Sequence, residues 1–247
     1  MRIFDAHFHI INDDFPIIEN QGYTPPNYIV TDYLEETTGM NVVGGAIVSG
    51  SFQGFDQAYL LPALKQLGDT FCGVTQLPYT TSDEEIIKLN QNGVKALRFN
   101  VKRGGSESLA RLDYFARRVY DLAGWHSELY IDAKDLPEII PIIEKLPAIS
   151  VDHLGLSEEG LPYLLRLVDK GIRVKATGFG RVELDVANAM KSIYHVNPDS
   201  LMFGTDLPST RATRHFEYAD VELIQQLFDE KAAGKILYTN AFQWYFK

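Results

Sequence analysis

The sequence predicts an α/β protein: a closed (β/α)8 barrel of the TIM type, formed as a single domain by residues 1–247. The main observation is that short runs rich in β-branched residues alternate eight times with longer stretches of helical periodicity, a pattern typical of parallel strands joined by helices. Eight such units in 247 residues leave about 31 residues for each, which suffices for a strand, a helix and a right-handed crossover. The first strand leads into His7-Phe8-His9, whereas an open doubly wound sheet would need a glycine-rich phosphate loop there.

The expected strands are the eight β-branched runs, at residues 2–7, 42–49, 71–77, 94–100, 128–133, 148–153, 172–177 and 201–205. The expected helices lie between them, at residues 28–38, 56–67, 82–92, 106–123, 136–145, 158–170, 184–195 and 218–228. Gly93, Gly124 and Gly171 each stand where a helix should end before a strand, as glycine commonly does. The apolar tail, residues 232–247, predicts a final helix packed on the barrel.

Composition and charge exclude several classes of function. Hydrophobic residues make up 45% of the chain, which supplies a large core, and the formal net charge is −10. That charge argues against nucleic acid or an anionic membrane as partner, because both require basic surfaces. The single Cys72 cannot form an internal disulfide, and neither a signal peptide nor a membrane-spanning run is evident, so we expect a soluble cytoplasmic protein. The sequence leaves open whether the chain forms a homo-oligomer.

Candidate catalytic residues follow the expected strands at their carboxyl ends, where TIM barrels place their active sites. His7 and His9 are spaced i, i+2 on an extended chain, so both imidazoles should point to one side, as a metal ligand pair or an oxyanion clamp. His153 ends the sixth strand and Asp206 follows the eighth. Each has a structural alternative: a strand histidine with an ordinary hydrogen-bond partner, a buried core histidine, or an aspartate that caps a turn. Their coincidence at one end of the barrel favours a catalytic site.

Other polar residues at the same end are candidates for substrate binding. Arg98 belongs to the fourth strand and Arg103 to the loop beyond it, while Tyr130 lies in the fifth strand and Arg181 follows the seventh. Arginines would hold a carboxylate or another small anion, although Arg98 could instead form a structural ion pair. Asp152 is out of phase with His153, so we expect its side chain to face the helices and to hold a backbone or ring N–H.

Several segments together resemble the amidohydrolase-related metal-dependent hydrolases, and within them the branch of sugar lactonases and 2-pyrone-4,6-dicarboxylate lactonases. They are residues 5–9 (Asp-Ala-His-Phe-His), 94–100, 124–132, 151–155, 175–178 and 203–208, and the likeness extends from residue 2 to residues 239–241. Metal-binding members commonly add a histidine at the end of strand 5, where this chain has Tyr130 and Asp132. Leu156 stands where the pyrone lactonase carries a carboxylate-binding arginine.

The resemblance implies a lactonase that opens a carboxylated or sugar-acid lactone by attack of water. Asp206 would be the general base, and His7, His9 and His153 would stabilise the oxyanion. They would do so directly, or through one divalent ion, zinc or manganese, bound by His7, His9 and Asp206. The alternatives are a metal-dependent decarboxylase of an aromatic or muconate-type acid, a lactone isomerase, and an anion-binding barrel without turnover.

Overall fold

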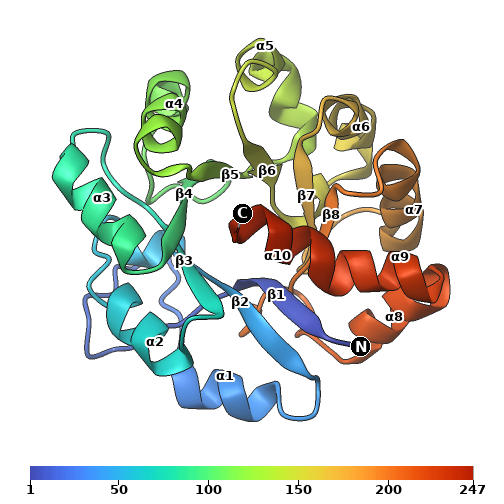
Figure 1. Cartoon of the computed structure of the whole chain (residues 1–247), viewed down its shortest axis with the longest axis horizontal. Helices are drawn as coiled ribbons and strands as arrows, with labels where there is room; N and C mark the ends of the chain where they lie inside the picture. Colours follow the sequence, from blue (N-terminus) through green and yellow to red (C-terminus); the bar gives the residue numbers. More distant parts are fainter. Residues whose placement is uncertain (247) are drawn as a thin grey trace.

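Eight parallel strands form a barrel with helices around its outside (Figure 1) in the computed structural model, which describes residues 1–246. Each strand is hydrogen-bonded to the next along the chain, from the first to the eighth. The predicted (β/α)8 architecture is therefore confirmed. The strands are β1 (Ile3–Phe8), β2 (Val42–Val48), β3 (Phe71–Thr75), β4 (Val94–Asn100), β5 (His126–Tyr130), β6 (Ile149–Val151), β7 (Arg173–Ala176) and β8 (Leu201–Phe203).

The helices that follow the strands are shorter than expected, because several begin after an irregular or 3-10 segment. The fifth differs most: the expected helix at residues 136–145 is replaced by the 3-10 helix Ala133–Glu138 and the single turn α5 (Ile140–Ile143). Pro137 and Pro141 explain this error, since proline lacks the N–H that a continuous helix needs. The others are α1 (Val30–Glu36), α2 (Leu60–Leu67), α3 (Asp83–Gln91), α4 (Leu112–Ala123), α6 (Leu161–Asp169), α7 (Val186–Val196) and α8 (Ala219–Leu227).

The tail covers the amino-terminal end of the barrel. Helix α9 (Glu230–Gly234), a turn of π-helix (Lys235–Thr239) and α10 (Asn240–Tyr245) follow one another, and α10 crosses the centre of the view in Figure 1. Tyr245 stacks on Phe4 with ring centroids 5.6 Å apart, and its hydroxyl donates to the Ala6 carbonyl at 3.3 Å. The predicted packing of the tail on the barrel is confirmed as far as residue 246; Lys247 lies outside the described residues.

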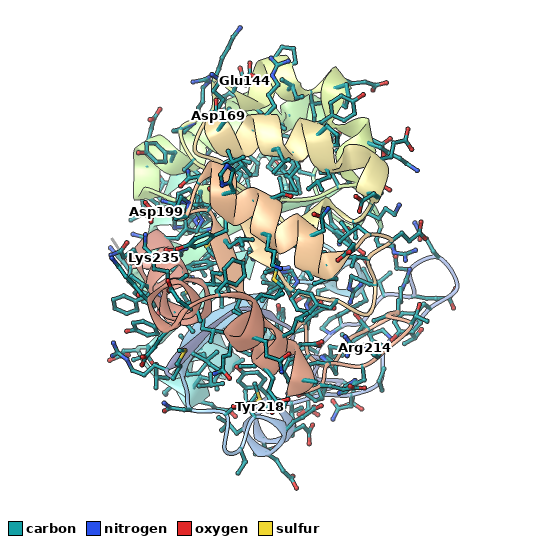
Figure 2. The ribbon with its side chains drawn as sticks, turned by 90° about the vertical axis from the view of Figure 1, so that its right-hand side faces the viewer. Glu144, Asp169, Asp199, Arg214, Tyr218 and Lys235 are labelled. Atoms are coloured by element: carbon teal, nitrogen blue, oxygen red, sulfur yellow. The ribbon has the colours of Figure 1, made fainter. Side chains whose placement is uncertain are left out.

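The two ends of the barrel differ in what covers them. Figure 2 shows Asp199 and Lys235, an ion pair at 2.6 Å, on the side of the tail, and Arg214 on the opposite side among the loops that follow the strands. The carboxyl ends of the strands thus remain available for a site. Residues 1–246 contain no helix that is long and apolar enough to cross a membrane.

Candidate active site

His7 of β1 and His9, just beyond its end, face the barrel interior because the strand changes phase. Ala6 packs inside the barrel, whereas Phe8 points outward and stacks on Tyr33 of α1, with ring centroids 3.8 Å apart. The register of β1 against β2 shifts in this part of the strand, as at a β-bulge. His7 and His9 therefore take the interior positions, as predicted, with ring centroids 5.1 Å apart.

Backbone hydrogen bonds bring Asp206 to these histidines across the seam of the barrel, the junction between the end of β1 and the segment that follows β8. The Asp206 N–H donates to the His7 carbonyl and the His9 N–H donates to the Leu207 carbonyl, each at 2.7 Å. The segments approach so closely that a Cβ at Gly204 would lie 2.7 Å from the His7 nitrogen. Asp206 is held opposite the histidines by its own backbone and theirs.

Asp5 strengthens this seam from within the chain's first strand. Its buried carboxylate accepts from the Thr205 N–H at 2.9 Å and the Thr205 hydroxyl at 2.7 Å, and from the Tyr33 hydroxyl at 3.1 Å. Burial raises the pKa of Asp5 to about 6, although the Thr205 donors oppose the shift. The sequence showed an acidic residue before the histidines without indicating that it binds the end of β8.

Three imidazoles and one carboxylate meet at the carboxyl end of the barrel. The His7 and His153 rings lie 4.8 Å apart, and Asp206 Oδ1 lies 3.8 Å from His7 Nε2 and 3.6 Å from His9 Nε2. All four side chains are buried. The structure therefore brings the four residues together as expected, while their catalytic roles stay a prediction.

Arg181 covers the other oxygen of Asp206. Its guanidinium donates to Asp206 Oδ2 through Nε, at 2.7 Å, and also through Nη2, and it reaches the Thr210 carbonyl at 3.0 Å and the Tyr130 hydroxyl at 3.4 Å. Burial would raise the pKa of Asp206, but the positive charge of Arg181, assisted by His153, holds that pKa well below its usual range. Asp206 is ionised at neutral pH.

The ring nitrogens of His7 and His9 have different partners. His9 Nδ1 lies 2.6 Å from the Val48 carbonyl, so this nitrogen donates, and Nε2 faces Asp206. His7 Nδ1 lies between the ammonium of Lys175, at 3.4 Å, and the carboxylate of Asp152, at 3.5 Å. It can accept from the first or donate to the second, so Nε2 is free to act either as a donor or as a metal ligand. Burial, with the charge of Lys175, holds the pKa of His7 well below 6.5, and burial lowers the pKa of His153 to about 3.

A charged layer lies beneath the histidines, and it corrects the expectation for Asp152. The Asp152 carboxylate faces the barrel interior, where it accepts from Arg98 at 2.8 Å and lies 3.6 Å from Lys175 Nζ and 3.5 Å from His7 Nδ1. Lys175 in turn donates to Glu128. The expectation failed because β6 ends at Val151 and the backbone turns before His153, so strand alternation no longer applies.

Lys175 and Glu128 were missed as parts of the site. Both are fully buried and lie on the four-residue strand β7 and the five-residue strand β5. A lysine and a glutamate inside strands this short are a usable signal, because such residues are almost never fully buried without a partner.

The structure places Arg98 in this inner layer and at the edge of the site. The guanidinium donates to Asp152 through two nitrogens, at 3.1 and 2.8 Å, and to the Ser49 carbonyl at 2.8 Å. This is the structural ion pair that the sequence left open as an alternative. Arg98 also lines the small cavity described next, so a contact with substrate stays a prediction.

Two cavities lead to the site from the mouth of the barrel. The inner one, about 30 Å³, is lined by His9 and His153 among others; the outer one, about 380 Å³, lies above it. Arg103, Tyr130, Arg181 and Arg211 line both. The predicted substrate-binding residues thus reach the cavities, together with Arg211 and Lys102, which the sequence did not single out for this role.

The residues at the centre fit one divalent ion. His7, His9 and Asp206 offer ligand atoms that all lie within 4.8 Å of one another, and His7 Nε2 and Asp206 Oδ1 are buried without a hydrogen-bond partner in residues 1–246. Two nitrogens and one oxygen suit zinc or manganese. His9 is also oriented as a metal-binding histidine usually is, because its other ring nitrogen donates to a carbonyl.

Comparisons with known proteins give a family match and several relatives. The model of the Amidohydrolase family matches residues 4–247. The chain is 26% identical over 239 residues to a 2-pyrone-4,6-dicarboxylate hydrolase of Comamonas testosteroni, covering 85% of this chain and 78% of that one. It is 23% identical over 258 residues to a D-galactarolactone isomerase of Agrobacterium fabrum, covering 96% and 88%. A crystal structure of a probable 2-pyrone-4,6-dicarboxylic acid hydrolase from Acinetobacter baumannii has the same fold, with a TM-score of 0.84, 24% identity and 99% coverage of both chains.

Proposed function

Because the chain belongs to the amidohydrolase family, we propose that it is a lactonase, a hydrolase that opens a lactone bearing a carboxylate or another acidic group. The proposal is supported by relatives that act on such compounds, a 2-pyrone-4,6-dicarboxylate hydrolase and a 4-sulfomuconolactone hydrolase. The observation that carries it is the buried Asp206 Oδ1, which has no hydrogen-bond partner within residues 1–246 and faces two imidazoles.

Lactone hydrolysis requires a nucleophilic water and a polarised carbonyl. The ionised Asp206 accepts the proton of the attacking water, a role that contributes about 10²- to 10⁴-fold to the rate. With its proton on Nε2, His7 donates toward the oxyanion that forms on the carbonyl, and His153 lies beside it. With its proton on Nδ1, His7 would instead bind a divalent ion together with His9 and Asp206, and that ion would supply Lewis acidity at the same place.

The acidic group of the substrate is bound at the mouth. Arg103, Arg181 and Arg211 lie in the walls of both cavities, and Arg103 Nε has no hydrogen-bond partner in the described part of the chain. Guanidinium groups bind carboxylates through paired, charge-assisted hydrogen bonds. A small anionic substrate therefore suits a protein whose net charge is −10, because the positive charge is concentrated where the substrate enters.

The test is a screen of purified protein with matched lactones. γ-Butyrolactone-γ-carboxylate, its neutral γ-carboxamide and sugar-acid lactones are followed by proton release, and the products by NMR. We expect ring opening of at least one anionic lactone; an isomerised lactone or release of CO₂ would support the alternative reactions instead. Elemental analysis of the same protein shows whether zinc or manganese is bound. Binding of the lactones with no turnover by the metal-loaded protein would contradict the proposal.

A further inference from the structure

The inner cavity is too small for any lactone. At about 30 Å³ it has the space of about one water molecule, and even an unsubstituted lactone ring is several times larger. Asp206 lines neither the inner nor the outer cavity and is fully buried. A substrate can reach this carboxylate only if a side chain that closes the site moves.

Arg181 is the side chain that separates Asp206 from the outer cavity. It lines both cavities and donates to Asp206 through two nitrogens. Tyr130, which also lines both, is less free to move because it ends β5 and its ring packs on His153, with centroids 4.8 Å apart. Arg181 belongs to the loop between β7 and α7 and extends back over the site.

The local backbone favours this position of Arg181. Gly178 has a φ of +62°, and a Cβ there would lie 2.8 Å from both Arg181 Nε and His153 Nδ1. Glycine therefore allows both Arg181 and His153 to pack closely against residue 178. The arginine that closes the site is packed into the structure and is not a surface side chain that rests on it.

We infer that Arg181 determines the specificity for anionic substrates by acting as a gate, which leaves Asp206 only when an acidic group of the substrate takes its place. This inference rests on the proposed lactonase function. Movement of Arg181 toward a substrate carboxylate keeps the guanidinium paired. Asp206 loses its partner with either substrate, but with a neutral lactone the buried guanidinium is left without a partner as well, which is strongly unfavourable. We expect a neutral lactone to be opened roughly 10²- to 10³-fold more slowly than its anionic counterpart.

The test compares two variants on two substrates. The substrates are γ-butyrolactone-γ-carboxylate and its γ-carboxamide, which differ in charge but hardly in shape. In Arg181→Ala the kcat/KM for the carboxamide should rise, roughly tenfold, while that for the carboxylate falls. Arg211→Ala is the matched control, because Arg211 lines both cavities and its guanidinium hydrogen-bonds to Asn20. This variant should have a lower kcat/KM for the carboxylate and no higher kcat/KM for the carboxamide. If Arg181→Ala does not fold, Arg181→Gln, which retains a donor for Asp206, replaces it.

The sign of the change for the neutral substrate decides between two roles. If Arg181 only binds the substrate carboxylate, its removal should lower kcat/KM for the carboxylate and leave kcat/KM for the carboxamide unchanged. That result would overturn the inference that Arg181 is a gate.

A second experiment, on crystals soaked with substrate, distinguishes failure of the gate from failure of the proposed function. If the wild-type protein opens neither lactone, the lactonase proposal fails for these compounds, and crystals soaked with the intact carboxylate test the gate. Arg181 bonded to the probe, with Asp206 exposed to the inner cavity, supports the inference. A probe that stays in the outer cavity while Arg181 remains on Asp206, or no probe bound in either cavity, overturns it.

Discussion

The layer beneath the histidines and the mouth above them both carry many charges, but they differ in how those charges are matched. In the layer, Arg98 and Lys175 face Asp152 and Glu128, and all four are buried. The outer cavity is lined by five cationic side chains, Lys102, Arg103, Lys134, Arg181 and Arg211, against Asp132 and Glu183. Matched charges stabilise one arrangement of the barrel, whereas the surplus of positive charge at the mouth would, under the proposed function, bind the acidic group of the substrate.

Asp206 lies between the two regions, and its replacement should have the largest effect. In Asp206→Asn we expect kcat to fall about 10²- to 10⁴-fold, because the amide cannot accept the proton of water. Steady-state kinetics on an anionic lactone measures the loss, and circular dichroism checks that the variant is folded. Near-normal turnover by a folded Asp206→Asn protein would remove Asp206 from the role of base.

The second prediction compares a lysine of the layer with a lysine of the mouth. Lys175→Met should lower the free energy of unfolding by about 3–5 kcal/mol, because Glu128 and Asp152 lose a partner in a buried site. Lys102→Met should cost less than about 1 kcal/mol, since Lys102 is 39% exposed where it pairs with Asp132. Urea unfolding at neutral pH measures both. Equal losses would contradict the distinction between the two regions.

The pH dependence of stability tests how strongly the site excludes protons. The pKa of His153 is lowered from 6.5 to about 3, so below pH 6.5 the unfolded chain binds a proton that the folded chain does not. Stability is therefore lost as pH falls from 6.5 toward 3, by about 2 kcal/mol at pH 5. Urea unfolding at pH 7 and pH 5 should show this loss in the wild type and a correspondingly smaller one in His153→Gln. The same slope in both proteins would mean that His153 is not the group responsible.

Replacement of Arg103 tests the contribution of the mouth alone, and we expect it to have the smallest effect on catalysis. In Arg103→Met the KM for γ-butyrolactone-γ-carboxylate should rise about tenfold, the value of one hydrogen bond to a charged group. The KM for the γ-carboxamide and the unfolding free energy should stay unchanged, because Arg103 stands outside the matched layer. A similar rise of KM for both lactones would show that Arg103 shapes the cavity without binding the charge.

Much of the architecture could be predicted from local patterns. The eight strands lie where β-branched runs indicated, and β4 has the predicted bounds of residues 94–100. The meeting of His7, His9, His153 and Asp206 followed from one rule, that the carboxyl ends of barrel strands share a face. No such rule predicts which charged side chains from different strands pair with one another inside the barrel. Asp152 was assigned to the wrong side because the chain leaves the strand at Val151, and the pair of Lys175 with Glu128 joins residues 47 positions apart.

The sequence by itself determined that this chain is a barrel with three histidines and one aspartate at its open end, because periodicity and strand ends are local properties. The tertiary structure decided which charges neutralise one another. Arg181 was expected to bind substrate, yet its main partner in the structure is Asp206. The physical reason is that ion pairing depends on distance and burial, and both are set only when strands far apart in the chain close around a common axis.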